Sequence, residues 1–402
     1  MPVPHIATAD YDYELAPERI ALHPLPERDE SKLLVYAESH IQDANFQDIH
    51  QYLPADSLLL FNNSKVIPAR LLYIKDSGGM IEIFCLEPKT GTPYIALQDM
   101  QESCWTCMVG GAKKWRNGMP LRWQLDTENE AYLEAELIEK NEEGYCIQFR
   151  WNLAGVSFAE VLEQLGQMPI PPYLLRKAEL SDRERYQTIY ASVAGSVAAP
   201  TAGLHFTDRV MESLQEKKVQ TAFTTLHVGA GTFKPVQAAF AHEHPMHAEW
   251  VEMDLATIES LATATQITCV GTTSLRSAES TYWYAVQHKE GKGLEDTTYL
   301  LPQFTPYEYG STESRQMVFA RLAAQMKERK LNRILFRTEL MIMPGYLFQV
   351  VDNIITNFHQ PKSTLLLLVD AFTKGQWKKI YQHALGNEYR FLSYGDSSLL
   401  KR

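Results

Sequence analysis

The sequence predicts an α/β protein in which a small all-β unit interrupts a larger α/β domain. Helix-like and strand-like segments alternate near both ends of the chain, whereas the residues between them form short β-prone runs. Hydrophobic residues make up 45% of the 402 residues, which is enough for large apolar cores. The predicted domains are residues 1–60 together with 153–402, and an insert at 61–152.

The first 60 residues contain one expected helix and two expected strands. Residues 17–25 (PERIALHPL) look helical, with Pro17 suited to a first helical turn. Residues 31–37 (SKLLVYA) and 57–61 (SLLLF) are typical of strands, and the second is apolar enough to be buried on both faces.

The insert is expected to form a small all-β barrel or sandwich. Its β-prone runs are separated by turn signals, such as the glycine-containing segments 76–79 (DSGG) and 89–91 (KTG). Repeated short strands with such turns are typical of small all-β folds. The runs are ARLLYIK (69–75), GMIEIFCLE (79–87), CWTCMVG (104–110), LRWQL (121–125), AYLEAELIE (131–139) and YCIQFRW (145–151).

After residue 152, helices and strands are expected to alternate again. Helices are predicted at 157–166, ending at Gly166, and at 208–218, with Thr207 as N-cap. Strands are predicted at 219–228 and at 267–271, where the second leads into another helix. Residues 364–372 (TLLLLVDAF) are a buried strand or a buried helix, because periodicity does not distinguish the two.

Composition excludes several functional classes. The longest aliphatic run, Leu365–Val369, is far shorter than the ~20 apolar residues of a membrane span, and the N-terminal residues lack a secretory leader, so a cytoplasmic location is expected. A net charge of −11 argues against a nonspecific nucleic-acid coat protein, but it does not exclude a local basic patch. Coiled-coil heptads are lacking, so a monomer is expected.

The five cysteines do not suggest a disulfide framework, because their number is odd and they are thinly spread. Cys104 and Cys107 form a CxxC pair, but a zinc site normally needs two further ligands at similar spacing. Reduced thiols near a core are therefore favoured over zinc.

Two histidines adjoin small residues in ways that suggest a ligand site. They are His205 in APTAGLHFT (199–207) and His227 in TLHVGAGTF (225–233). Gly229 and Gly231 follow an expected strand, where glycine lets the backbone approach a ligand, and histidine is the commonest general base. The alternative is a tight turn with a core histidine.

A third segment, HEHPMH (242–247), contains three histidines in the pattern H-x-H-x-x-H. On a strand His242 and His244 would share a face and could hold a metal with His247. A clear fourth ligand is missing, so polar loop histidines are the favoured interpretation.

Thr272, Thr273 and Ser274 stand where a strand is expected to meet a helix. Free N–H groups at a helix start attract carboxylates or phosphates. Ordinary N-capping is the alternative, and neither the P-loop nor the GxGxxG spacing is present.

Eight long, unusual strings run in order across nearly the whole chain. They are YDYELAPERIALHPLPERDESKLLV (11–35), LLLFNNSKVIPARL (58–71), RYQTIYASVAGSVAAPTAGLHFT (185–207), LHVGAGTFKPV (226–236), HPMHAEW (244–250), VGTTSLRSAES (270–280), MPGYLFQVVDNIITNFHQPKSTLLLLVDAF (343–372) and YRFLSYGDSSLL (389–400). Through these strings the sequence resembles the S-adenosylmethionine:tRNA ribosyltransferase-isomerase family of queuosine synthesis.

The resemblance implies a larger α/β barrel-like domain with an inserted small β-barrel. It also implies an activity: the ribosyl moiety of S-adenosylmethionine is transferred and isomerised onto 7-aminomethyl-7-deazaguanine at the tRNA wobble position. The products would be epoxyqueuosine-tRNA, adenine and methionine. S-adenosylmethionine would be a consumed substrate, and neither a metal nor another cofactor is expected. A related enzyme with a changed acceptor and a noncatalytic RNA-binding protein are the alternatives.

Site residues are predicted by combining the resemblance with the chemistry. His205 and His227 are the expected acid/base pair, with His247 and Glu249 next, and His244 in the same rank. Residues expected to bind S-adenosylmethionine are Gly229, Gly231, Thr232, Thr272, Thr273, Ser274 and Arg276. Residues expected to bind tRNA or its base are Arg185, Tyr186, Gln187, His359 and Lys362.

The sequence departs from the family pattern at three places, one of which is the poorly fitting stretch 285–332. Asn62-Asn63-Ser64 stands where the family usually has Asn-Asp-Thr, so one expected carboxylate is replaced by an amide. Residues 98–125 do not resemble the family's usual barrel segment, which puts tRNA contacts by the insert in question.

Overall fold

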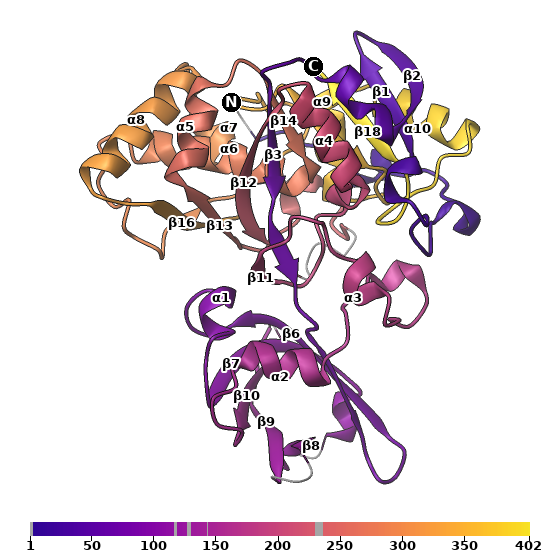
Figure 1. Ribbon diagram of the computed structural model, residues 1–402, viewed down its shortest axis with the longest axis vertical. Helices are drawn as coiled ribbons and strands as arrows, with labels where there is room; N and C mark the ends of the chain where they lie inside the picture. Colours follow the sequence, from indigo (N-terminus) through magenta and orange to yellow (C-terminus); the bar gives the residue numbers. More distant parts are fainter. Residues whose placement is uncertain (1–2, 116–118, 127–129, 143, 230–235) are drawn as a thin grey trace.

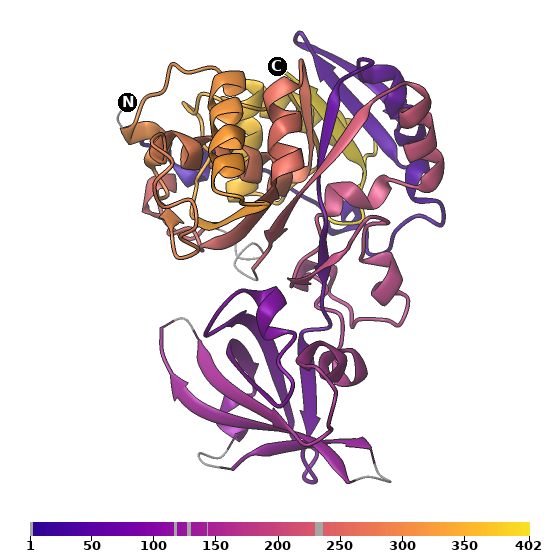
Figure 2. The ribbon, with the colours of Figure 1, turned by 60° about the vertical axis from the view of Figure 1, so that its left-hand side comes forward.

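Two bodies of different architecture make up the molecule (Figure 1). This computed structural model describes residues 3–115, 119–126, 130–142, 144–229 and 236–402. The larger body is built on a ten-stranded mixed sheet, and the smaller body on a six-stranded antiparallel sheet. Figure 2 shows the second sheet set apart from the first, beyond the chain segments that connect them.

The ten-stranded sheet has parallel strands at its centre. Strands β12, β3, β14 and β17 run parallel to one another, and most strands toward the edges pair antiparallel. In spatial order the strands are β15 (Leu300–Leu301), β16 (Arg333–Thr338), β13 (Glu249–Asp254), β12 (Gln220–His227), β3 (Leu58–Asn62), β14 (Ile267–Val270), β17 (Asn353–Asn357), β18 (Ser397–Lys401), β1 (Lys32–Ala37) and β2 (His40–Asn45).

Alternating side chains of β3 enter two different cores, as a strand periodicity of two requires. Leu58 and Leu60 pack in a core shared with helices α6, α8 and α9, whereas Leu59 and Phe61 pack in a core shared with α4. The prediction that this strand is buried on both faces is therefore confirmed. The helices are α1 (Pro93–Ala96), α2 (Phe158–Leu165), α3 (Asp182–Arg185), α4 (Asp208–Glu216), α5 (Leu255–Thr263), α6 (Gly271–Gln287), α7 (Thr305–Glu308), α8 (Arg315–Glu328), α9 (Thr364–Thr373) and α10 (Trp377–Gly386).

Local capping explains where the predicted helices begin. The Ser157 and Glu160 side chains form a capping box at the start of α2, and the Thr207 hydroxyl accepts a bond from Val210 N at the start of α4. The ambiguous apolar run is helix α9, whose start is capped by Ser363. The helix predicted at 17–25 is wrong: only Pro17–Arg19 forms a 3₁₀ turn. Pro24 and Pro26 disfavour helical backbone in the residues before them.

The larger sheet is open among the described strands. Its edge strands are β15 and β2, and each pairs with one neighbour only. The barrel-like closure that the resemblance implies for this body is therefore absent from the strand pairing of the described residues. A separate two-stranded sheet joins β4 (Ser64–Val66) to β11 (Val193–Ser196) near the connection to the smaller body.

The smaller sheet is nearly closed. Its order is β5 (Arg70–Ile74), β6 (Met80–Pro88), β7 (Glu102–Gly110), β10 (Tyr145–Trp151), β9 (Ala131–Lys140) and β8 (Leu121–Asp126). The two edges meet where Trp123 of β8 donates from Nε1 to the Leu72 carbonyl of β5 at 2.8 Å. The core under this sheet also contains Phe158 and Leu162 of α2, beyond residue 152. The division into domains at residues 61 and 152 stays a prediction.

A transmembrane helix was sought among the described residues, and none of their helices combines the length and the apolar character that a span needs.

A candidate ligand cleft at the ends of the parallel strands

A cleft of about 740 Å³ lies where the parallel strands end. Val228 follows β12, Gly271 follows β14, and Asn357 ends β17, so three of the four parallel strands contribute residues to its wall. Ligands of α/β sheets bind at this edge, because loops there are free to vary while the strands hold their ends in place. The full lining is Tyr173, Tyr186, Ala198, Ala199, Pro200, Thr201, Ala202, Val228, Gly271, Thr272, Thr273, Thr356, Asn357, Phe358, His359, Gln360, Ser363, Leu365, Leu392 and Ser393.

A second chamber of about 750 Å³ shares one wall with this cleft. Thr272, Thr273 and Leu365 line both cavities. A charged pair stands among the lining residues of the second chamber. Its other lining residues are His244, Met246, His247, Glu249, Arg276, Leu340, Met341, Ile342, Thr364 and Leu368.

Two buried hydroxyls of the cleft lack a hydrogen-bond partner among the described residues: Tyr186 Oη and Thr273 Oγ1. Burial raises the pKa of Tyr186 well above its usual value, so its hydroxyl keeps the proton that it can donate. Buried polar groups are normally paired, and an unpaired one needs an explanation. Both hydroxyls are available to a ligand.

Helix α6 begins at the cleft without a side-chain cap. Its N-cap is Val270, and the Ser274 hydroxyl donates back to the Val270 carbonyl at 2.8 Å. The capping interpretation of Thr272, Thr273 and Ser274 is therefore wrong for the described structure. Thr272 and Thr273 line the cleft, whereas Ser274 is fully buried in the helix.

His359 is the one predicted histidine that lines the main cleft. Its Nε2 lies 2.9 Å from Thr356 Oγ1, and its backbone N–H donates to the Tyr381 hydroxyl at 2.9 Å. Burial lowers the pKa of His359 to about 4. The ring is therefore neutral at pH 7, and a neutral imidazole can accept a proton.

His205 lies behind the cleft wall. Its Nδ1 is 2.8 Å from Ser31 Oγ, and its Nε2 accepts from Asn357 Nδ2 at 3.2 Å. Burial lowers the pKa of His205 to about 4. Because both ring nitrogens are engaged and Asn357 itself lines the cleft, His205 is placed to orient Asn357.

His227 ends β12 and is not among the residues that line either described chamber. Its Nδ1 has no partner among the described residues, and burial lowers its pKa to about 4. A side chain at Gly195 would meet the His227 ring at 2.8 Å and Pro93 at the same distance. His227 thus lies where the α1 segment of the smaller body packs on the larger one.

Glu249 and Arg276 form the charged pair of the second chamber. Glu249 also accepts from Gly229 N at 3.1 Å, and Arg276 donates from Nε to the Leu340 carbonyl at 2.9 Å. The pair ties the Gly229 turn to the start of α6. His247 and His244 stand beside it, and burial together with His247 lowers the pKa of His244.

The remaining predicted residues that the structure describes line neither chamber. Gly231 and Thr232 lie outside the described residues. Gln187 is held by Val66, whose carbonyl and N–H it contacts at 2.7 and 3.1 Å, and Lys362 forms an ion pair with Asp12 at 2.6 Å. Arg185 lines a small separate pocket.

Sequence reasoning missed much of the cleft wall. Tyr173, Asn357 and Ser393 were not singled out, although Asn357 and Ser393 lie within the family-like strings. These three polar residues belong to no recognisable sequence motif, because they come from three distant segments that are brought together only by the fold.

Asn63, which replaces the expected carboxylate, lines neither chamber. Its Oδ1 accepts from Thr225 Oγ1 at 2.7 Å, and its N–H donates to the Thr224 carbonyl at 3.0 Å. Its side chain and backbone therefore tie the end of β3 to β12.

The cysteines and histidines show no metal arrangement in the described ranges, where no group of three or more suitable side chains is placed to hold an ion. Cys104 Sγ lies 3.4 Å from Cys146 Sγ rather than forming a pair with Cys107. Burial and the Cys146 thiol raise the pKa of Cys104 to about 12, so Cys104 keeps its proton; both cysteines are free.

Known proteins resemble this chain over almost its entire length. A family model described as queuosine biosynthesis protein matches residues 8–400. An S-adenosylmethionine:tRNA ribosyltransferase-isomerase from Magnetococcus marinus is 37% identical over 395 residues, which cover 97% of this chain and 93% of the relative. A crystal structure of an S-adenosylmethionine tRNA ribosyltransferase from Thermotoga maritima is 27% identical, covers 97% of this chain and 99% of its own, and superposes with a TM-score of 0.46.

Proposed function

The chain belongs to the queuosine biosynthesis protein family, and we infer that it acts as an S-adenosylmethionine:tRNA ribosyltransferase-isomerase. The observation that carries this inference is the match over 97% of the chain to a relative of that name. The cleft supports it, because matched segments from β12, β14 and β17 converge there.

The acceptor and products are the finer part of the proposal. We propose that the ribosyl moiety is transferred to 7-aminomethyl-7-deazaguanine at the tRNA wobble position and rearranged to give epoxyqueuosine. Adenine and methionine would leave. The reaction is a transfer with isomerisation, so the proposal includes neither a metal nor a redox cofactor, and it treats the protein as a monomer.

The two joined chambers suit the two ends of S-adenosylmethionine. We place the adenosyl part in the main cleft, where Tyr186 and Thr273 offer unpaired hydroxyls. The methionine part then extends past Thr272 into the second chamber, whose Met246 and Met341 suit an aliphatic chain. Thr272 and Thr273 belong to the first turn of α6 and line both chambers, and the free N–H groups of a helix start favour a carboxylate.

His359 is our first candidate for proton transfer, because it alone among the predicted histidines lines the main cleft. The positive sulfonium acidifies the hydrogens on C5′, and a base must remove one before the sugar can rearrange. A neutral imidazole held by Thr356 can accept that proton and return one to departing adenine. His205 would act indirectly by orienting Asn357.

The test of the function is adenine release. The protein is incubated with S-adenosylmethionine and tRNA carrying 7-aminomethyl-7-deazaguanine, with unmodified tRNA as the control. Adenine formed only with the modified tRNA supports the proposal. Release with a different acceptor would show that the acceptor has changed, and tRNA binding without S-adenosylmethionine binding would indicate a noncatalytic protein.

His359→Ala tests the assignment of the base. We expect kcat to fall about 10²-fold or more, because a positioned acid or base contributes about 10²–10⁴-fold. His383→Ala is the control, since His383 lies far along the chain on α10 and pairs with Asp43 on β2. Wild-type turnover of the His359 variant would remove this residue from the mechanism.

A further inference from the structure

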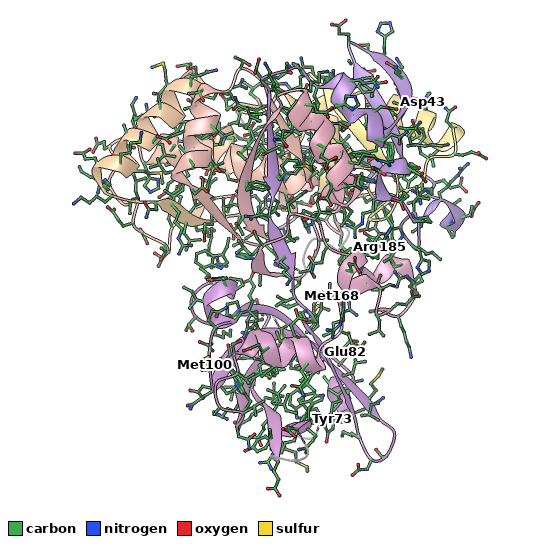
Figure 3. The ribbon with its side chains drawn as sticks, viewed as in Figure 1. Asp43, Tyr73, Glu82, Met100, Met168 and Arg185 are labelled. Carbon is green, nitrogen blue, oxygen red and sulfur yellow. The ribbon has the colours of Figure 1, made fainter. Side chains whose placement is uncertain are left out.

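A small pocket lined by three arginines adjoins the cleft. It measures about 270 Å³, and its cations are Arg28, Arg185 and Arg390. Ser393 lines both this pocket and the cleft, so the two cavities share a wall. In Figure 3, Arg185 lies at α3, on the side of the larger body that faces the smaller one.

Two of the three guanidinium groups bond only to neutral carbonyls among the described residues. Arg28 donates to the Gln187 and Glu184 carbonyls at 2.7 and 3.0 Å. Arg185 donates to the Pro26 carbonyl at 3.1 Å and to the Leu25 carbonyl. These bonds hold the two side chains in place without neutralising their charge.

Arg390 differs, because Asp396 neutralises it at 3.0 Å. No carboxylate side chain of the described residues lines the pocket itself. Burial and the charge of Arg185 lower the pKa of Arg28, whereas the charge of Glu184 acts in the opposite direction, in keeping with two close cations in a partly desolvated place. A bound anion would relieve the repulsion between them.

We propose that the Arg28–Arg185 pocket binds a backbone phosphate of the RNA strand whose nucleobase enters the cleft. The inference rests on the proposed function, because it takes tRNA as the substrate. Guanidinium groups match phosphate oxygens geometrically, and phosphate contacts fix the register of a nucleic acid without reading its sequence.

The position of the pocket favours an RNA phosphate over a free one. The pocket is much smaller than the cleft, so it suits a phosphate group rather than a second nucleotide. The rings of Tyr186, in the cleft, and Tyr394, in the pocket, pack edge to face with centroids 5.9 Å apart. The base and the phosphate of one nucleotide are separated by a distance of this order, so a base in the cleft would bring its phosphate to the pocket.

The test compares Arg28→Gln and Arg185→Gln with Arg183→Gln. Arg183 lies on the same short helix and loses the same charge, but its guanidinium bonds to Glu163 and to the Gly166 carbonyl. The rate of adenine release is measured while the concentration of tRNA or of S-adenosylmethionine is varied, at several salt concentrations, so that a KM is obtained for each substrate. We expect the KM for tRNA to rise about tenfold in each of the two variants, while the KM for S-adenosylmethionine and the Arg183 variant stay at wild-type values.

The salt dependence separates charge from structure. Losing one phosphate contact should reduce the slope of log kcat/KM for tRNA against log salt by about 0.7–1. Arg185→Lys should bind tRNA more tightly than Arg185→Gln but more weakly than the wild type, since lysine keeps the charge but lacks the paired N–H donors of the guanidinium group. Inorganic phosphate should compete with tRNA on the wild type and more weakly on the double variant. Competition that is equal in both would mean that free phosphate binds elsewhere and would count against the site.

Three results distinguish the possible failures. Wild-type protein that releases no adenine with modified tRNA overturns the proposed function, and the same variants are then compared by direct tRNA binding. An unchanged tRNA affinity and an unchanged salt slope in both arginine variants overturn the phosphate site, whatever the activity. A lower thermal midpoint with an unchanged KM for tRNA assigns the arginines to structure alone and overturns the site as well.

Discussion

The two halves of helix α6 treat their buried polar groups in opposite ways. At the start of the helix, the Thr273 hydroxyl has no partner among the described residues and faces the cleft. Two turns later, the buried Glu279 carboxylate accepts from Tyr346 Oη and from the N–H groups of Gln349, Val350 and Val351, at 2.7 to 3.1 Å. One sequence string, VGTTSLRSAES, therefore serves ligand binding at one end and folding at the other.

The difference gives a rule for the cleft: polar groups that the chain satisfies itself hold the fold, whereas unpaired hydroxyls in the cleft lining are open to a ligand. His205, with both ring nitrogens engaged, belongs to the first kind. Tyr186, with an unpaired buried hydroxyl, belongs to the second. The rule predicts which substitutions lower stability and which lower activity.

The largest expected effect is on stability, from Glu279→Ala. The change leaves four buried donors without an acceptor, so the free energy of unfolding should fall by about 3–5 kcal/mol, as measured by urea titration. Glu290→Ala is the control, since Glu290 is exposed and pairs with exposed Lys292; its effect should stay within about 0.5 kcal/mol. Equal effects for the two variants would contradict the rule.

The next effect is a loss of stability in acid. The pKa of His205 is about 4 in the folded protein against an ordinary value of 6.5, so the unfolded chain binds the proton more tightly. The contribution of His205 is therefore fully present above pH 6.5 and is lost as the pH falls toward 4, by about 2 kcal/mol at pH 5. Protonation of Nε2 would also break its bond from Asn357 Nδ2.

Urea unfolding at pH 7.5, 6 and 5 measures this loss. His205→Gln should show a shallower decline than the wild type, because one proton-linked group is gone. Parallel declines in the wild type and the His205 variant would show that His205 is not the linked group.

A smaller effect, on activity alone, is expected from Thr273→Val. Valine keeps the shape but removes the unpaired hydroxyl, so the free energy of unfolding should not fall. The KM for S-adenosylmethionine should rise about tenfold, which corresponds to about 1.4 kcal/mol of lost binding. Thr281→Val on the same helix is the matched control: its hydroxyl donates to the Ser277 carbonyl at 2.8 Å, so stability should change and KM should not.

The strands of the smaller sheet and helices α2, α4 and α6 could be predicted from the sequence because their signals are local. Alternation and turn residues located β5 to β10, and the caps Ser157 and Thr207 located α2 and α4. The helix expected at 17–25 does not form because Pro24 and Pro26 disfavour helical backbone in the residues before them. The order of the ten strands was beyond local signals, because most neighbours in the sheet are distant in sequence.

The site was predictable only in part, for a related reason. The strings around His359 and Thr272 were noticed, and both residues line the cleft. The emphasis on His205 and His227 followed from their glycine-rich surroundings, but burial and packing decide where a ring faces, and both rings lie outside the main cleft. Histidine type and flanking glycines do not encode that orientation.

The smallest effect is expected from Asn63→Asp, which restores the carboxylate that the family pattern has at this position. A carboxylate there can accept from Thr225 Oγ1 as the amide oxygen does now, so the tie between β3 and β12 should survive. Because Asn63 lines neither chamber, kcat/KM for adenine release should change less than about threefold, below about 0.7 kcal/mol. Asn62→Asp is the contrasting variant, since Asn62 Nδ2 donates to the buried Leu226 carbonyl at 3.0 Å and a carboxylate cannot. An increase of tenfold or more in the Asn63 variant would show that this position takes part in the chemistry and that the cleft extends to it in the working enzyme.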